Sequence, residues 1–256
     1  MAEGSKKRVA LVTGGTGGIG TAICERLYKE GYKVAANYKD FTKAIQWREE
    51  AKKWRENELR MGIDIHIVEG DVADFKSTTA MMQEVTEEVG PIDILVNNAG
   101  ITRDAPLHKM TPEQWHEVMD TNLTSVFNCS RAVIEGMIAR GWGRIINMSS
   151  VNGAKGAYGQ TNYASAKAAM YGFSKSLALE VAKKGITVNS ISPGYIGTSM
   201  VMAIREDVRE KILAQVPMGR FGAPDEIASM VAYLASDQAA FITGANMNVN
   251  GGLHMY

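Results

Sequence analysis

Arg8-Val-Ala-Leu-Val-Thr-Gly-Gly-Thr-Gly-Gly-Ile-Gly20 is the stretch of sequence that decides the fold. It opens with an apolar run that is typical of a buried parallel strand, and it continues into a turn rich in glycine. Residues Thr21 to Tyr28 follow with helical spacing and few helix breakers. Strand, glycine-rich turn and helix in this order predict a dinucleotide-binding site. Such a turn lets the backbone approach a pyrophosphate, and the start of the helix binds the anion.

The glycines of this turn are spaced Gly14-x-x-x-Gly18-x-Gly20, which differs from the commoner Gly-x-Gly-x-x-Gly pattern. A structural glycine turn that binds no ligand is the alternative interpretation. The candidate cofactor contacts within the turn are Gly14, Thr16, Gly17, Gly18, Ile19 and Gly20.

Short apolar strands alternate with longer helical segments along the rest of the chain. Besides the first strand, we expect strands near residues 33–38, 63–68, 92–97, 143–148, 186–191 and 246–249. Helices are expected near residues 41–60, 76–89 and 111–140, in a segment that ends near 184, and after Pro224. Repeated strand–helix units with right-handed crossovers predict an α/β fold. We therefore expect one domain over residues 1–256, a doubly wound parallel sheet of about seven strands with helices on both faces.

Composition narrows the classes of function. The 256 residues carry a formal net charge of zero, which gives no support for a nucleic-acid partner or an anionic membrane surface. Cys24 and Cys129 lie in expected helices without the spacing of a metal site, so we expect buried thiols and no metal. No stretch approaches ~20 apolar residues, so neither a signal peptide nor a membrane span is expected. These features predict a cytoplasmic protein.

Tyr163 and Lys167 lie four residues apart in Tyr-Ala-Ser-Ala-Lys, and Ser150 lies thirteen residues before the tyrosine. Residues spaced by four share one face of a helix. A phenol has a pKa of ~10, and a neighbouring ammonium favours its ionised form, so we expect Lys167 to lower the pKa of Tyr163. A serine hydroxyl at the end of a nearby strand could hold a substrate carbonyl. Ser149 is the alternative for that hydroxyl.

These motifs occur in an order that resembles the classical short-chain dehydrogenase/reductase family, over essentially the whole chain. The residues that carry the resemblance are Thr13-Gly14-x-x-x-Gly18-x-Gly20, Asp71-Val72, Asn97-Asn98-Ala99-Gly100, Asn122, Ser150, Tyr163-x-x-x-Lys167 and Pro193-Gly194. The resemblance implies a Rossmann-like fold and an oxidoreductase that uses a nicotinamide cofactor.

The resemblance also implies roles for individual residues. Tyr163 is the general acid in reduction, Ser150 binds the substrate oxygen, and Lys167 lowers the pKa of the tyrosine and holds the nicotinamide ribose. Asn122 positions a water in a proton relay, or it only bridges backbone groups. The further implied cofactor contacts are Asp71, Val72, Asn98, Ala99, Gly100, Pro193, Gly194 and Ile196. Asp71 has a second interpretation as a turn residue that caps a helix.

The end of the second strand bears on the choice of cofactor. An acidic side chain there selects NAD through the ribose hydroxyls, whereas this chain has Asn37-Tyr38-Lys39. Lys39 could meet a 2′-phosphate, which favours NADP(H). The glycine-rich turn lacks the basic residue of many NADP-dependent relatives, and Lys39 could instead be a solvated loop lysine.

Within the family, three stretches are similar to bacterial acetoacetyl-CoA reductases of polyhydroxybutyrate synthesis. They are residues 98–104, residues 149–163 and the ending Asn250-Gly-Gly-Leu-His-Met-Tyr256. The similarity implies reduction of acetoacetyl-CoA to (R)-3-hydroxybutyryl-CoA. It also implies a substrate lid near residues 194–216, where Gly197-Thr-Ser-Met200 departs from the usual acidic position after the threonine. The implied substrate contacts are Asp104, Tyr158, Gln160, Tyr195 and Arg205; Arg205 could also be an exposed helix arginine.

Two alternative functions are compatible with the same sequence motifs, and the family resemblance also implies an oligomeric state. A 3-oxoacyl-(acyl-carrier-protein) reductase shares the same motifs, and its acidic partner would require a basic patch. Arg103, Lys109, Arg140 and Arg144 could contribute to such a patch. A nucleotide-binding regulator without catalysis is the alternative of another class, although Asn122, Ser150, Tyr163 and Lys167 are all present. Family relatives imply a homotetramer.

Overall fold

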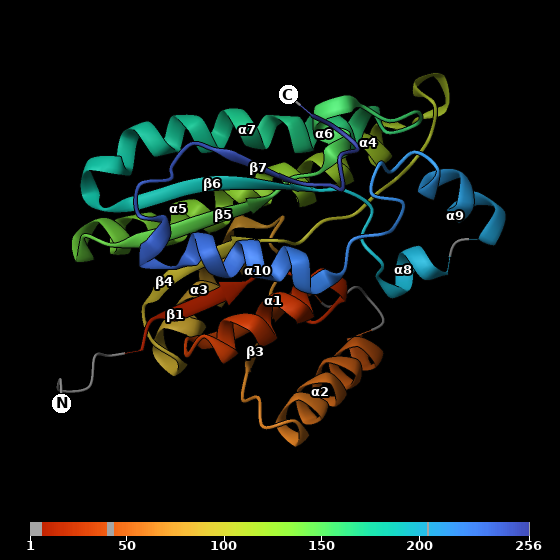
Figure 1. Ribbon diagram of the computed structural model, residues 1–256. Helices are drawn as coiled ribbons and strands as arrows, with labels where there is room; N and C mark the ends of the chain where they lie inside the picture. Colours follow the sequence, from red (N-terminus) through yellow and green to blue (C-terminus); the bar gives the residue numbers. More distant parts are fainter. Residues whose placement is uncertain (1–6, 40–43, 204, 256) are drawn as a thin grey trace.

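One sheet of parallel strands organises the computed structural model, which describes residues 7–39, 44–203 and 205–255. The seven strands of this sheet lie in the order β3-β2-β1-β4-β5-β6-β7 (Figure 1). Their bounds are β1 (Val9–Val12), β2 (Lys33–Tyr38), β3 (His66–Glu69), β4 (Ile92–Asn97), β5 (Gly143–Met148), β6 (Ile186–Pro193) and β7 (Asn246–Val249). The predicted doubly wound sheet is confirmed, and its order reverses between β1 and β4, where such folds bind their ligands.

Helices cover both faces of the sheet. Helices α1 and α10 pack against each other over one face, and α3, α5 and α7 lie on the other (Figure 1). Short helices α6, α8 and α9 lie toward the edge at which the strand arrows point. The helix bounds are α1 (Gly18–Lys29), α2 (Ala44–Arg60), α3 (Phe75–Glu88), α4 (Pro112–Met119), α5 (Ser125–Arg140), α6 (Val151–Lys155), α7 (Thr161–Val181), α8 (Ser199–Met202), α9 (Glu206–Leu213) and α10 (Pro224–Ala235).

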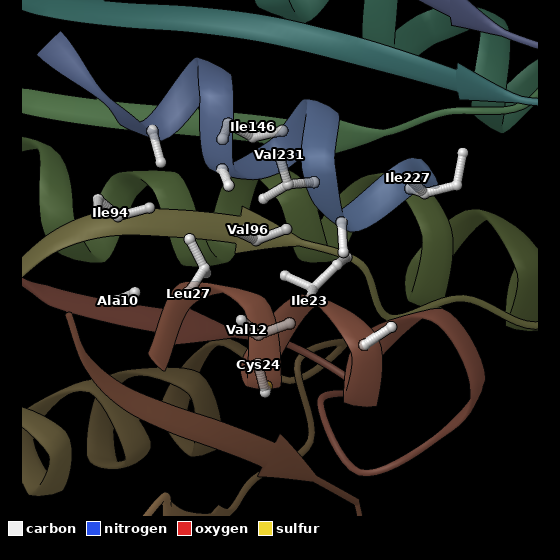
Figure 2. Packing of buried hydrophobic residues seen from close by; sticks show 14 of the residues in the cluster. Ala10, Val12, Ile23, Cys24, Leu27, Ile94, Val96, Ile146, Ile227 and Val231 are labelled. Atoms are coloured by element: carbon white, nitrogen blue, oxygen red, sulfur yellow. The ribbon is translucent and has the colours of Figure 1, made fainter. Parts of the chain in front are cut away.

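Side chains that point alternately to the two faces of the sheet divide the core into two layers. Val12 of β1 faces α1 and α10, where it packs near Ile23 and Val231, as Figure 2 shows. Leu11, one residue earlier, belongs to the opposite layer with Met81 of α3. Successive side chains of a strand point to opposite faces, so a strand buried on both sides reads as a continuous apolar run. The first strand was recognised in the sequence for this reason.

Two expected boundaries are wrong. The third strand was expected to begin at Ile63, but β3 begins at His66. Ile63 is buried, and its N–H donates to the carbonyl of Glu58 at 2.8 Å, so the residue serves to end α2. The helix expected over residues 111–140 is interrupted by a π-helical turn, Asp120–Thr124, which separates α4 from α5.

Candidate active site

The glycine-rich turn leaves the start of α1 open to an anion. The N-cap residue of α1 is Gly17, no side chain caps the helix, and no acidic residue lies in its first turn. Gly17 and Gly18 are both exposed, and Gly18 adopts a positive φ of 48°. A Cβ on Gly17 would meet no atom within 4 Å. The space beside the turn and the uncapped N–H groups therefore fit a dinucleotide pyrophosphate.

The turn is braced to the end of β4. Oγ1 of Thr13 accepts hydrogen bonds from the N–H groups of Asn98 and Ala99 at 2.9 and 3.0 Å. The side-chain amide of Asn98 donates to the carbonyls of Thr13 and Gly14 at 2.9 and 3.2 Å. Asn98 thus holds the two loops together with its side chain. Sequence reasoning assigned no role to Thr13, although its place at the end of β1 was the available signal.

Lys39 and Asp71, which were assigned separate cofactor contacts, form an ion pair with each other. Nζ of Lys39 lies 2.6 Å from Oδ2 of Asp71, and both side chains are partly exposed. The pairing follows from the sheet, because Tyr38 at the end of β2 lies opposite Glu69 at the end of β3. The pair lies at the carboxyl ends of two neighbouring strands. A ribose or a ribose phosphate that reached it would meet a cation and an anion side by side.

Two predicted cofactor residues turn their side chains into the protein. Val72 is 3% exposed and Ile196 is 5% exposed, and both pack in hydrophobic clusters. Cofactor contacts at these positions would therefore use the backbone. Gly100 lies close to two of the catalytic candidates, because a Cβ there would come within 3.2 Å of Asn122 Oδ1 and 3.5 Å of Lys167 Nζ. Pro193 and Gly194 form the end of β6 and the residue after it.

Strand β5 and helix α7 bring the catalytic candidates together. Ser150 follows the end of β5 and caps α6, and its Oγ accepts from the N–H of Asn152 at 3.1 Å. Lys167 is buried, and its Nζ donates to the carbonyl of Met148 at 2.6 Å. The same ammonium lies 5.6 Å from the centre of the Tyr163 ring. The hydroxyl of Ser149 instead donates to the carbonyl of Lys167 at 2.7 Å, so it is engaged with the helix backbone.

Burial controls the ionisation of the tyrosine and the lysine. Burial raises the pKa of Tyr163, and a hydrogen bond with Ser150 opposes that rise. Burial lowers the pKa of Lys167 to about 8. The expected lowering of the tyrosine pKa by Lys167 is not found in this structure. A phenol whose pKa is raised stays protonated at neutral pH, which is the form that a general acid requires.

Asn122 lies in the π-helical turn between α4 and α5. Its side chain makes two hydrogen bonds to one residue: Oδ1 accepts from the N–H of Ile101 at 2.8 Å, and Nδ2 donates to the carbonyl of Ile101 at 2.9 Å. The side chain therefore bridges backbone groups and fixes the segment after Gly100, as one interpretation of the sequence anticipated. Relay of a proton through a water at Asn122 stays a prediction.

Among the substrate candidates, Gln160 and Asp104 are joined by a hydrogen bond, whereas the other three lie at separate positions. Nε2 of Gln160 donates to Oδ2 of Asp104 at 2.9 Å, and Nδ2 of Asn152 donates to Oε1 of Gln160 at 3.0 Å. Asn152 was not predicted, and its signal was its place two residues after Ser150. Tyr158 is 92% exposed, so its ring is available at the surface. Burial raises the pKa of the half-buried Tyr195.

Tyr195 lines an open cavity beside the end of β6, together with Gly194, Asn248 and Asn250. Arg205 lies elsewhere, at the N-cap of α9, where its guanidinium makes two hydrogen bonds to Asp207 at 2.7 and 3.0 Å. The structure thus shows Arg205 as an exposed arginine paired within its own helix.

Within residues 7–39, 44–203 and 205–255, no cluster of three or more His, Cys, Asp or Glu side chains could hold a metal ion. Over the same residues, no helix has the length and apolar character needed to cross a membrane.

Comparisons with known proteins identify a matching family model and several relatives. The family model described as enoyl-(acyl carrier protein) reductase matches residues 14–254. Acetoacetyl-CoA reductase of Cupriavidus necator is 54% identical over 97% of this chain and 99% of its own length. Acetoacetyl-CoA reductase of Rhizobium meliloti is 54% identical, covering 96% and 98%. The 3-oxoacyl-[acyl-carrier-protein] reductase FabG of Vibrio cholerae is 48% identical, covering 97% and 98%.

The family model and the relatives extend over nearly the whole chain, and the site combines an uncapped glycine-rich turn with a serine, a tyrosine and a lysine at one sheet edge. The chain therefore belongs to the short-chain dehydrogenase/reductase family.

Proposed function

We propose that the protein reduces acetoacetyl-CoA to (R)-3-hydroxybutyryl-CoA, with NADPH as its preferred cofactor. The observation that carries the proposal is the Ser150–Tyr163–Lys167 group, with its serine and lysine buried and its tyrosine partly buried, beside an open glycine-rich turn. Relatives named acetoacetyl-CoA reductase, 54% identical over nearly their whole length, support the choice of substrate.

The residues divide the work of the reaction between binding and protonation. A nicotinamide dinucleotide, when bound, supplies the hydride. The turn from Gly14 to Gly20 would hold its pyrophosphate, and Lys167 its nicotinamide ribose. Ser150 and Tyr163 would donate hydrogen bonds to the ketone oxygen, where negative charge develops. Tyr163 then transfers its phenolic proton to that oxygen, which is favourable because the developing alkoxide is a stronger base than a phenolate. Burial keeps the phenol protonated until then.

The preference for NADPH rests on Lys39. Its ammonium lies at the end of β2 with Asp71 as partner, and no carboxylate occupies the last positions of that strand itself. A 2′-phosphate would compete with Asp71 for the lysine. A charged hydrogen bond of this kind is worth about 1.5–3 kcal/mol, so Lys39→Ala should lower kcat/KM with NADPH about tenfold or more and change the value with NADH much less. Lys175→Ala, an exposed lysine on α7, is the matched control.

The experiment that tests the function compares substrates and cofactors directly. Oxidation of NADPH and NADH is followed at the same enzyme concentration with acetoacetyl-CoA and with acetoacetyl-carrier-protein. Faster turnover of the CoA thioester with NADPH is the expected result. Preference for NADH would remove the role of Lys39 and leave the reductase intact. No turnover of either thioester would refute the proposal.

A 3-oxoacyl-(acyl-carrier-protein) reductase is the second candidate, favoured by the 48% identical relative of that name. The structure gives little support to the basic patch that an acidic carrier would require. Arg144 is buried, Arg140 pairs with Asp93, and Arg103 pairs with Glu117. Arg140 and Arg144 also lie near the start of β5, away from the end that carries Ser150. Faster turnover of the carrier-protein substrate would favour this candidate.

The same proposal includes the domain organisation, the oligomeric state and the cellular role of the enzyme. We infer one catalytic domain over the whole chain, a lid formed by residues 194–216, a homotetramer, and a role in polyhydroxybutyrate synthesis in the cytoplasm. The helices α8 and α9 within residues 194–216 lie at the edge where the strands end, which supports the lid (Figure 1). Light scattering tests the assembly, and a monomeric mass would contradict it. A regulator without catalysis would bind NADPH and leave both thioesters unchanged.

A further inference from the structure

Helix α7 carries another polar side chain in line with the catalytic pair. Tyr171 lies eight residues after Tyr163 and four after Lys167, and this spacing places the three on one face of the helix. Its side chain is half-buried rather than turned to solvent. None of the motifs described above includes Tyr171.

The hydroxyl of Tyr171 makes two close polar contacts. It donates to the carbonyl oxygen of Ser150 at 3.1 Å, and it lies 2.9 Å from Oγ of Ser192 on β6. Ser192 is fully buried and donates to Oδ1 of Asn246 on β7 at 2.8 Å. Helix α7 is thereby joined both to the backbone of the catalytic serine and to the last two strands of the sheet.

The carbonyl of Ser150 bears on catalysis because it belongs to the residue whose hydroxyl binds the substrate oxygen in the proposed function. Ser150 has extended backbone angles, φ −164° and ψ 151°, at the junction between β5 and α6. The N–H of Gly153 also donates to its carbonyl, at 2.9 Å. A peptide held by two donors cannot rotate without losing one of them. The hydroxyl of Tyr171 therefore helps to fix the orientation of the peptide that follows Ser150.

The line of hydrogen bonds continues to the wall of a cavity. Nδ2 of Asn246 donates to Oδ1 of Asn248 at 3.2 Å, and Asn248 lines the cavity that also contacts Tyr195. A buried hydroxyl is costly unless it is hydrogen-bonded, and connected polar side chains reinforce one another. Because Ser192 donates its only proton to Asn246, its Oγ can only accept from Tyr171, so the single phenolic proton of Tyr171 is shared between Oγ of Ser192 and the carbonyl of Ser150.

We propose that Tyr171 is a positioning residue that aims the hydroxyl of Ser150 at the reacting carbonyl, and that Ser192 and Asn246 hold Tyr171 in place. The inference rests on the proposed function, since it assumes that Ser150 binds the substrate oxygen. Tyr171 acts through the serine backbone and transfers no proton to the substrate.

Tyr171→Phe tests the proposal with the smallest change, because it removes one oxygen and keeps the ring in its packing. Loss of a single hydrogen bond at the serine carbonyl should lower kcat about threefold to tenfold and leave KM for NADPH unchanged. Tyr233→Phe, on the partly exposed side of α10, is the matched control and should keep the kcat of the wild type.

A double-mutant cycle with Ser150→Ala separates positioning from general support of the fold. Once the serine hydroxyl is gone, Tyr171→Phe should cause no further loss of kcat. Single turnovers at high enzyme concentration make the slow Ser150→Ala background measurable. An equal loss in both backgrounds, or an unchanged kcat in Tyr171→Phe alone, would overturn the proposal. The wild type is assayed first on each thioester, so failure of the proposed function would be seen there and not in the cycle.

Discussion

The variant Lys167→Met measures how much burial of the Lys167 ammonium lowers the stability of the protein. Lys167 is 3% exposed, and burial lowers its pKa from 10.5 to about 8. At about 1.4 kcal/mol for each pH unit between the two values, the charged lysine lowers the free energy of unfolding by about 3 kcal/mol at neutral pH. The variant lacks this penalty. It also leaves the carbonyl of Met148 without its donor, which costs about 1–3 kcal/mol.

The dependence on pH separates the two effects. Between pH 8 and 10.5 the unfolded chain still holds the lysine proton while the folded chain has released it. The unfolded state binds more protons in this interval, so the free energy of unfolding of the wild type rises with pH. Below pH 8 both states hold the proton, and the penalty is complete. The lost bond to Met148 is the same at every pH, so it cancels when the difference between variant and wild type is compared at two pH values.

Urea unfolding at pH 7 and pH 10, followed by circular dichroism at equal protein concentration, is the assay. We expect the stability of Lys167→Met relative to the wild type to fall by about 2–3 kcal/mol between these pH values. Lys175→Met, an exposed lysine on the same helix, should show no such change. A relative stability of Lys167→Met that is the same at both pH values, within about 0.5 kcal/mol, would refute the reasoning that burial of the ammonium controls its pKa.

Other predictions concern the acid, the turn and the thiols. Tyr163→Phe should lower kcat at least about a hundredfold and leave the circular dichroism spectrum unchanged, because it removes only the proton donor; an unchanged kcat would contradict the mechanism. Gly17→Ala should weaken NADPH binding, measured by titration calorimetry, without changing Tm, because the added methyl meets open space. Gly20→Ala should lower Tm as well, because its Cβ would overlap a backbone carbonyl of the same turn; equal Tm values would contradict this difference. Cys24 and Cys129 are buried with raised pKa values, so a thiol reagent should modify neither in the folded protein and both in urea.

Much of the fold could be predicted because its signals are local. Buried parallel strands read as apolar runs, and the glycine-rich turn marks the start of α1. The catalytic residues could be proposed because Tyr163 and Lys167 share one helix face. The convergence of Ser150 follows from the rule that ligands bind at the carboxyl ends of parallel strands.

The features that escaped prediction depend on partners distant in sequence. Lys39 and Asp71 were each considered alone, and their ion pair arises only from the register between β2 and β3. The bond between Tyr171 and Ser150 joins residues on α7 and at the end of β5. The raised pKa of Tyr163 required knowledge of how deeply the ring is buried, because burial outweighs the other influences on it.

The π-helical turn at Asp120–Thr124 changes the phase of the helix that it interrupts. A π turn contains one residue more than an α turn, and each residue of an α-helix advances by ~100°, so the turn rotates α5 relative to α4 by about that angle. Helix α4 contacts α7, whereas α5 packs on α3 and β4. Helices α4 and α5 follow each other almost without a break, yet they contact neighbours that lie in different directions. Deletion of a single residue from the turn would restore an ordinary helix, and it would turn Cys129 and Met137 away from the core that they now fill.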